Sequence, residues 1–371
     1  MILRRILLCG ASIGILTVAS PTYALFFDSS FPSTIYKVQP DGSETYVGAT
    51  PSGLKTGLVI ADDADWYMDP ACDVLLHQVS KFAKEMKERR VHGISLRRCA
   101  PLLNARVVDD LISRLGDAGS LQRLNLLRVP MAPTSPARLK LLPGLRTLDL
   151  AYTAISDEDL KAVGSVARLE TLNISYTSLS DKGLAYLKQA QEVSSTLKSL
   201  DVSSTSISNE GLLFLSELKG LERVRASKCG VNDAGVDYLA RIKTLKEAAL
   251  SFTNMTDQSL AALSSLPGLE SLSVNSTRIT DVGMLSVSRM SSLKVLNIGS
   301  TSVTDKGINA ISALPQLDTL YLFETKISDE GLIDLAKFKQ LKKLFLAPND
   351  QLNPAAVGQL KKRLPETDVQ F

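Results

Sequence analysis

The sequence is poor in the side chains that most enzymes use for acid–base and metal chemistry. Its 371 residues include only two histidines, His77 and His92, together with one tryptophan and four cysteines, and aromatic residues make up 5%. Neither histidine has a cysteine, histidine or carboxylate at metal-ligand spacing, and no glycine-rich phosphate loop is present. The sequence therefore predicts no metal centre, no cofactor and no catalytic residues, and we expect a non-catalytic protein.

The sequence also lacks an excess of charge of either sign. Lysine and arginine number 42 against 39 acidic residues, and without residues 1–24, which hold Arg4 and Arg5 and no acid, the net charge falls to +1. A nucleic-acid-binding protein needs a basic footprint, so this class is excluded. Hydrophobic residues make up 44%, which is enough for a packed core and excludes global disorder.

The first 24 residues predict an export signal. A short basic start at residues 1–5 is followed by an apolar stretch at 6–18 and by a polar segment that ends at Ala24. This is the order of a secretory signal peptide, and we expect cleavage near Ala24. A membrane anchor is the alternative, but a span needs about 20 apolar residues. No later segment reaches that length, so we expect a secreted or periplasmic protein.

A period of 24 residues governs most of the remaining sequence. Each unit follows the pattern L-x-x-L-x-[LIV]-x-x-T-x-[IVL]-[ST]-D-x-G-L-x-x-L, and its first leucine is position 1. All steps between units are 24 residues except 91 to 121 (30) and 169 to 197 (28). The eleven units start at Val91, Leu121, Leu145, Leu169, Leu197, Leu221, Leu245, Leu269, Leu293, Leu317 and Leu341.

Within one unit the hydrophobic period changes. Leu148 and Leu150 alternate as in a short strand, whereas Leu160 and Val163 recur at helical spacing. The Ser or Thr at position 12 suits a helix N-cap, and the following Asp favours the helix dipole; a row of bound cations along these acids is the alternative. A lone unit leaves its leucines open on both sides, so neighbours must stack. The acids are Asp157, Asp181, Asp233, Asp257, Asp281, Asp305 and Asp329.

This pattern resembles the leucine-rich repeat family, and the match covers about residues 91–371. The second half of the unit is similar to short bacterial repeats and to the cysteine-containing repeats of F-box proteins, but no F-box precedes it. The resemblance implies an α/β fold: a right-handed solenoid, or horseshoe, with a parallel sheet on the concave face and short helices on the convex face. It also implies that position 9, mostly threonine, hydrogen-bonds backbone groups of adjacent turns.

The ends of the array predict caps. Residues 69–90 predict an amphipathic capping helix with Asp69 as N-cap and Pro70 as first helical residue, because apolar residues from Leu75 to Met86 form one stripe. Before it, an Asp-Gly pair between two short apolar segments predicts a β-hairpin. The expected divisions are a signal peptide (1–24), a hairpin and capping helix (25–90), the repeats (91–340), and a last partial repeat with a C-terminal cap (341–371).

Three cysteines remain after residue 24. Cys229 occupies position 9 and is expected to be a small buried group. Cys99 occupies position 9 of the first unit, beside the predicted capping helix that carries Cys72. In an oxidising compartment these two could form a disulfide, which would contribute about 3 kcal/mol; two free thiols are the alternative.

The concave face is where we expect a partner to bind. Positions 2, 3, 5, 7 and 8 point to it, and aromatic and arginine side chains there are the types that usually anchor interfaces; scattered surface residues without a partner are the alternative. Tyr152 and Tyr176 occupy equivalent positions in adjacent units, so we expect them to lie side by side. The candidate binding residues are Tyr152, Tyr176, Phe252, Tyr321, Phe323, Phe345, Arg97, Arg98 and Arg128.

These patterns favour a binding function over catalysis. We expect an exported scaffold, monomeric, that recognises a protein or a glycan on its concave face. A structural envelope component without a specific ligand and a factor directed at host molecules are the alternatives. An enzyme would need a metal or a hydrolytic site in residues 25–90.

Overall fold

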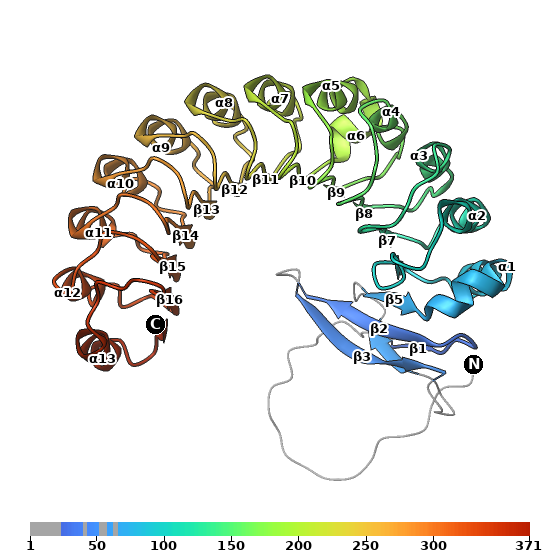
Figure 1. Cartoon of the computed structure of the whole chain (residues 1–371), viewed down its shortest axis with the longest axis horizontal. Helices are drawn as coiled ribbons and strands as arrows, with labels where there is room; N and C mark the ends of the chain where they lie inside the picture. Colours follow the sequence, from blue (N-terminus) through green and yellow to red (C-terminus); the bar gives the residue numbers. More distant parts are fainter. Residues whose placement is uncertain (1–23, 40–42, 52–57, 62–65) are drawn as a thin grey trace, which may run out of the picture.

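The computed structural model describes residues 24–39, 43–51, 58–61 and 66–371. These residues form an open arc with strands along the inside and helices along the outside (Figure 1). The predicted signal peptide lies outside the described residues except for Ala24. The arc, the parallel sheet and the outer helices confirm the predicted solenoid.

One sheet of fifteen strands lines the inside of the arc, in the order β17-β16-β15-β14-β13-β12-β11-β10-β9-β8-β7-β6-β5-β2-β3. Neighbouring repeat strands are parallel and pair at equivalent positions, as Leu172 with Leu200. The repeat strands are β6 (Gly93–Ser95), β7 (Arg123–Asn125), β8 (Thr147–Asp149), β9 (Thr171–Asn173), β10 (Ser199–Asp201), β11 (Arg223–Arg225), β12 (Glu247–Ala249), β13 (Ser271–Ser273), β14 (Val295–Asn297), β15 (Thr319–Tyr321) and β16 (Lys343–Phe345).

Short helices form the outer layer. They are α2 (Ala105–Leu115), α3 (Ser135–Arg138), α4 (Asp159–Val163), α5 (Asp181–Gln189), α6 (Gln191–Thr196), α7 (Asn209–Leu215), α8 (Asp233–Leu239), α9 (Asp257–Leu263), α10 (Asp281–Val287), α11 (Asp305–Ile311), α12 (Gly331–Leu335) and α13 (Pro354–Arg363). Most of them pack on the helices of the two adjacent units, whereas α6 packs on α5 of its own unit and α13 on α12.

The leucines of the pattern fill the space between the two layers. Leu145, Leu148 and Leu150 have no exposed surface, and neither do Leu160 and Val163 of the following helix. Such residues join one continuous core along the array. Truncating one buried leucine to alanine typically costs about 2–5 kcal/mol, so these side chains set the fold.

The aspartate column links each helix start to the next unit. Asp257 accepts hydrogen bonds from the Thr280 amide (2.8 Å) and the Thr280 hydroxyl (2.6 Å), and that hydroxyl in turn accepts from Val282 N. A Cβ on Gly283 would lie 2.4 Å from Asp257 Oδ1, so the pattern glycine leaves room for the acid. Hydrogen bonds to the cap residue of the next unit therefore account for the acids. The same Asp-to-hydroxyl contact recurs from Asp157, Asp181, Asp233, Asp281 and Asp305.

Position 9 bonds mainly within its own unit, which differs from the expectation. The Thr253 hydroxyl donates to the Leu250 carbonyl three residues earlier (2.6 Å), and the equivalent threonines do the same. The longer Asn349 donates to Leu322 O of the preceding unit (2.8 Å), and Cys229 Sγ lies 3.2 Å from Val202 O.

The start of the predicted capping helix is wrong. Residues 66–70 form a strand, β5 (Trp66–Pro70), and the helix α1 begins at the next cysteine (Cys72–Glu88). The reason is strand pairing: β5 joins β2 (Ser33–Val38) on one side and β6 on the other. β2 also pairs antiparallel with β3 (Glu44–Thr50). The predicted Asp-Gly turn between them lies outside the described residues.

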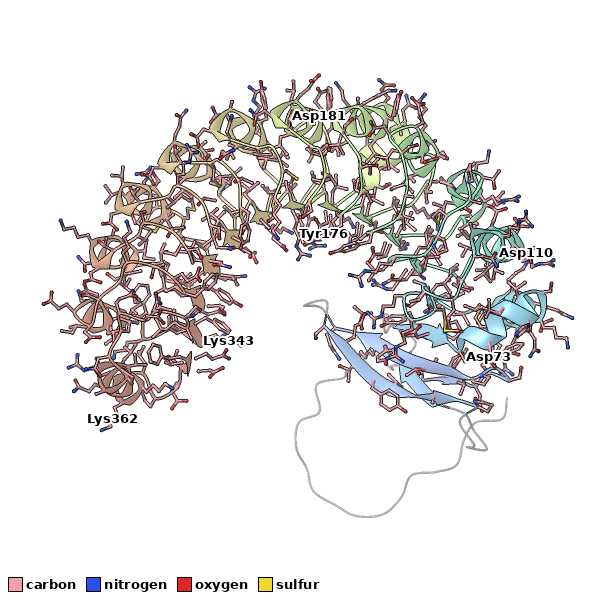
Figure 2. The ribbon with its side chains drawn as sticks, viewed as in Figure 1. Asp73, Asp110, Tyr176, Asp181, Lys343 and Lys362 are labelled. Atoms are coloured by element: carbon pink, nitrogen blue, oxygen red, sulfur yellow. A yellow bond between two sulfur atoms is a disulfide. The ribbon has the colours of Figure 1, made fainter. Side chains whose placement is uncertain are left out.

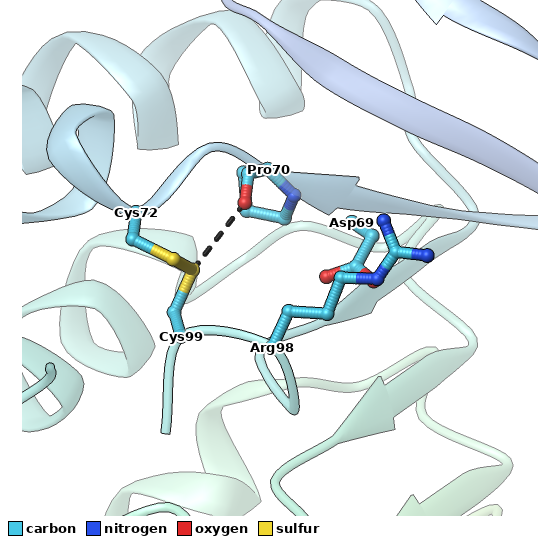
Figure 3. The surroundings of a disulfide bond; sticks show 5 residues. All are labelled: Asp69, Pro70, Cys72, Arg98 and Cys99. Carbon is cyan, nitrogen blue, oxygen red and sulfur yellow. Dashed lines mark hydrogen bonds and ion pairs between the residues drawn. A yellow bond between two sulfur atoms is a disulfide. The ribbon is translucent and has the colours of Figure 1, made fainter. Parts of the chain in front are cut away.

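A disulfide ties the first helix to the first repeat. Cys72 at the start of α1 is bonded to Cys99, with 5.1 Å between their Cα atoms (Figure 3). Cys229 is a free, buried thiol. Two further strands, β1 (Ala24–Phe27) and β4 (Leu58–Ala61), form a separate two-stranded antiparallel sheet.

Two units have an irregular helical half. In the unit from Leu121, prolines delay the helix, which is only four residues long and continues as a 3-10 turn at Leu139–Leu141. In the unit from Leu169, the four extra residues form a second helix, α6. The C-terminal cap contains the predicted basic helix within α13, and also a strand that was not predicted, β17 (Asp368–Gln370), which covers β16.

Candidate binding surface on the concave face

Position 8 of the repeat has a backbone conformation that few side chains adopt. We call these residues the left-handed column, because their φ angles lie between 49° and 60°. For residues with a Cβ this conformation costs about 1–2 kcal/mol each. The column consists of Arg128, Tyr152, Tyr176, Ser204, Lys228, Phe252, Ser276, Ser300 and Glu324.

Two kinds of hydrogen bond accompany this conformation. In five of the nine units an Asn or Asp side chain at position 5 accepts from the amide two residues later, as Asp149 does from Ala151 N (2.9 Å). At position 8 the amide donates to the carbonyl of position 7 in the next unit, as Tyr152 N does to Ser175 O (3.1 Å). The turn is therefore fixed by the array, and the side chain at position 8 is presented on the concave side.

Three members of the column form a continuous stack. The rings of Tyr152 and Tyr176 are nearly parallel (8°) with centroids 4.2 Å apart, and the guanidinium of Arg128 lies 4.6 Å from the Tyr152 centroid. The tyrosines nevertheless remain 42% and 43% exposed, and Tyr176 points into the hollow of the arc (Figure 2). The structure thus brings these rings side by side, as their equivalent positions predict.

Phe252 belongs to the same column further along the arc. Its ring is 52% exposed, and the Lys228 ammonium lies 4.9 Å from its centroid. Both tyrosines and Phe252 are large apolar side chains held exposed in a costly conformation. Exposed aromatic side chains of this kind are the type that usually anchors protein interfaces.

A second aromatic cluster lies near the C-terminal end of the concave face. The rings of Tyr321 and Phe345, both at position 5, stack at 4.2 Å and 5°. Phe323 at position 7 lies flat over Gly299, where a Cβ would come within 2.4 Å of its ring. These three rings are partly buried against one another and the strand, so they offer less free surface than the first stack.

A polar concavity of about 300 Å³ lies between the N-terminal sheet, which contributes Glu44 and Tyr67, and the repeat strands β7–β11. Position 5 side chains line its floor, including Asp149, Asn173 and Asp201. Burial and the nearby Asp201 charge raise the pKa of Asp149, although hydrogen bonds from Ala151 N and Asn173 oppose this. The concavity presents hydroxyls, amides and carboxylates together with the guanidinium groups of Arg123 and Arg225, so it offers both acceptors and donors to a polar ligand.

Arg97 and Arg98 face the N-terminal sheet, so the structure does not bring them to the proposed surface. Arg97 makes a two-pronged ion pair with Glu44 (2.7 and 3.1 Å) and donates to the Tyr67 hydroxyl (2.9 Å). Burial would raise the pKa of Glu44, but the bonds from Arg97 and Tyr67 hold it below its usual value. Arg98 lies 3.0 Å from buried Asp69 (Figure 3). Both arginines therefore dock the N-terminal strands onto the repeats.

Sequence reasoning missed a column of alternating charge at position 2. Its ion pairs include Lys198–Glu170 (2.9 Å), Lys246–Glu222 (3.0 Å) and Lys294–Glu270 (2.9 Å). The signal was readable, because acids and bases alternate at every repeat step. This charge column is Arg146, Glu170, Lys198, Glu222, Lys246, Glu270, Lys294, Asp318 and Lys342.

The described residues hold no group of three or more His, Cys, Asp or Glu side chains arranged for a metal ion. Within the same residues, no helix has the length and apolar character needed to cross a membrane.

Comparison with known proteins identifies the repeats. Residues 112–355 match the family described as "Leucine-rich repeat region". Among solved structures, an internalin from Listeria monocytogenes aligns with a TM-score of 0.53 and 21% identity, over 75% of this chain and 77% of the internalin. A leucine-rich repeat protein from Leptospira interrogans aligns with a TM-score of 0.47 and 16% identity, over 78% and 86%.

No curated protein matches the sequence. At 21% identity, the likeness to the internalin shows a shared fold. The family match covers more than half of the chain, and the predicted resemblance is thereby confirmed: the chain belongs to the leucine-rich repeat family.

Proposed function

We propose that this protein is an exported, non-catalytic scaffold that recognises a protein partner through the concave face around the tyrosine stack. The observation that supports this most is the exposure of Tyr152, Tyr176 and Phe252 in a left-handed conformation. Exposed aromatic rings on a stiff sheet can anchor a partner with little loss of conformational entropy.

Export is supported by two observations. Residues 1–24 have the composition of a signal peptide. The Cys72–Cys99 disulfide is a bond that persists in oxidising compartments and is rare in the cytosol. An intact-mass measurement on the exported protein should find a chain that starts at or near Leu25; a retained leader would contradict cleavage.

The binding role is tested by crosslinking capture from an envelope or host extract. The double variant Tyr152→Ala/Tyr176→Ala should capture its partner at least tenfold less efficiently, because two central aromatic anchors are lost. The matched control is Val282→Ala/Leu285→Ala, which removes exposed apolar surface from α10 on the convex side. Equal loss in both variants, or none in the first, would contradict the proposal.

A scaffold that only spaces other components is the second candidate. Such a protein has no saturable ligand, so a titration with the captured partner separates the two. Saturation that is abolished by the tyrosine variant supports recognition, whereas a linear, non-saturating response supports the spacing role.

A further inference from the structure

The left-handed column contains a break between two occupied stretches. Arg128, Tyr152 and Tyr176 form one stack, and Lys228 and Phe252 form the next. Between them stands Ser204, which has the same backbone conformation but no ring or long side chain. Within the described residues, no ring or cation stacks on the face of Tyr176 that is turned toward Ser204. We call this break the Ser204 slot.

The dimensions of the slot fit one flat group. Three strand steps separate Tyr176 from Phe252, and at about 4.2–4.8 Å per step their rings lie about 13–14 Å apart. The Lys228 ammonium lies 4.9 Å from the Phe252 ring, which leaves about 8–9 Å between that ammonium and Tyr176. A ring stacked about 4 Å from Tyr176 would lie about 4–5 Å from the ammonium, within cation–π range. Two rings would not fit.

We propose that the Ser204 slot receives one aromatic side chain of the partner protein. The guest ring would stack on Tyr176 and present its other face to the Lys228 ammonium, so that the column becomes continuous from Arg128 to Phe252. This inference rests on the proposed function, since it specifies the chemistry that the concave face recognises.

The Tyr176 ring on one side of the slot and the Lys228 ammonium on the other distinguish an aromatic side chain from other ligands. A sugar ring could pack against Tyr176, but it has no π face to accept the Lys228 cation. A nucleobase has such a face, but its phosphates need a basic surface, and the net charge is only +1 without residues 1–24. An aromatic side chain can stack on Tyr176 and accept the Lys228 cation on its other face, and it carries no negative charge.

The test is an NMR titration of the full protein with the peptide acetyl-Gly-Gly-Trp-Gly-Gly-amide. The matched probe carries cyclohexylalanine, which keeps the ring volume and lacks the π face. We expect the tryptophan peptide to shift the resonances of Tyr176 and Lys228 and to bind at least fivefold more tightly than the cyclohexylalanine peptide. Lys228→Met should weaken binding about threefold, because it removes the cation and keeps the stem.

Ser204→Tyr should weaken binding of the tryptophan peptide at least tenfold, because it fills the slot. Tyrosine already occupies this conformation at 152 and 176, so the variant should fold, and its circular dichroism and melting curve check this. Ser276→Tyr is the control, since it adds the same side chain to the column beyond Phe252, and it should bind like the unmodified protein.

Three outcomes would overturn the inference: equal affinity for the two peptides, unchanged binding by Ser204→Tyr, or stronger shifts at Tyr176 from cellopentaose or an octathymidylate. If Tyr152→Ala/Tyr176→Ala weakens partner capture while Ser204→Tyr does not, the slot is wrong and the binding face stands. If neither variant weakens capture, the proposed function itself is wrong.

Discussion

At the scale of single residues, the most unusual group is the carboxylate of Asp69. Its side chain is fully buried, and neither oxygen accepts a hydrogen bond among the described residues, although Arg98 Nε lies 3.0 Å away without hydrogen-bond alignment. Burial raises its pKa to about 6, and the charges of Arg98 and Arg97 only partly oppose this, while Glu44 adds to it. The folded protein therefore holds a proton on Asp69 at a pH where the unfolded chain has lost it.

This burial predicts a specific pH dependence of stability. Between about pH 4 and pH 6 the folded state binds more protons at Asp69 than the unfolded state, so its contribution to stability falls as pH rises. Asp69→Asn should match the unmodified protein near pH 4 and be more stable by up to about 3 kcal/mol at pH 7. Urea unfolding of both proteins from pH 4 to 7 measures this, and parallel curves would refute it.

The glycine at position 15 leaves room for the aspartate of the preceding unit. Gly283→Ala should destabilise the protein by about 1–3 kcal/mol, because its Cβ would meet Asp257 Oδ1 at 2.4 Å and Leu260 Cδ1 at 2.6 Å. The control is Gly358→Ala in α13, where no atom lies within 4 Å of the new Cβ. That change should stabilise the helix by about 0.5–1 kcal/mol. Thermal and urea unfolding compare the two; similar effects would rule out the Asp257 contact as the cause.

Residues at position 8 show what a sequence pattern cannot indicate. Arg, Tyr, Ser, Lys, Phe and Glu share no turn propensity, so nothing at those positions predicts a left-handed backbone. The conformation accompanies a backbone hydrogen bond from the position-8 amide to the neighbouring unit, which forms whatever side chain is present. The buried leucines were predictable because a buried position requires an apolar residue. Position 8 accepts many residue types, so its conformation leaves no pattern in the sequence.

At the scale of elements, strand pairing overrode a local helix signal. Asp69-Pro70 is a good helix start by itself, but β2 and β6 flank this segment and every residue of β5 is buried. The partners of β5 are distant in sequence, so no local pattern reveals them. The same limit applies to Arg97 and Arg98, whose charges are paired with Glu44 and Asp69 of the N-terminal strands.

The disulfide is an element-scale feature, since it joins α1 to the first repeat. In denatured, unreduced protein that begins after residue 24, we expect one reactive thiol, that of Cys229; three would refute the bond. Removing the bond through Cys72→Ser/Cys99→Ser should lower stability by about 3 kcal/mol, because it closes a loop of 27 residues. Cys229→Ser is the control for the loss of a sulfur, and urea unfolding is the measurement.

At the scale of the whole molecule, each end of the array is covered by a different device. The N-terminal end continues the sheet with β5, β2 and β3 and packs α1 beside α2, whereas the C-terminal end adds only α13 and β17 (Figure 1). Both leave the concave side open along the repeats. The repeat period predicted this elongated arc. Each unit has leucines exposed on two sides, so each side must be covered by another unit or by a cap.

The charge column also bears on how such an array can grow or shrink. Between Arg146 and Lys342 each base stands next to acids, so losing any single repeat would set two like charges side by side. Losing two adjacent repeats would restore the alternation, as would inserting two. Gains and losses of two adjacent repeats along this stretch therefore preserve the ion pairs, whereas the gain or loss of one repeat places like charges next to each other.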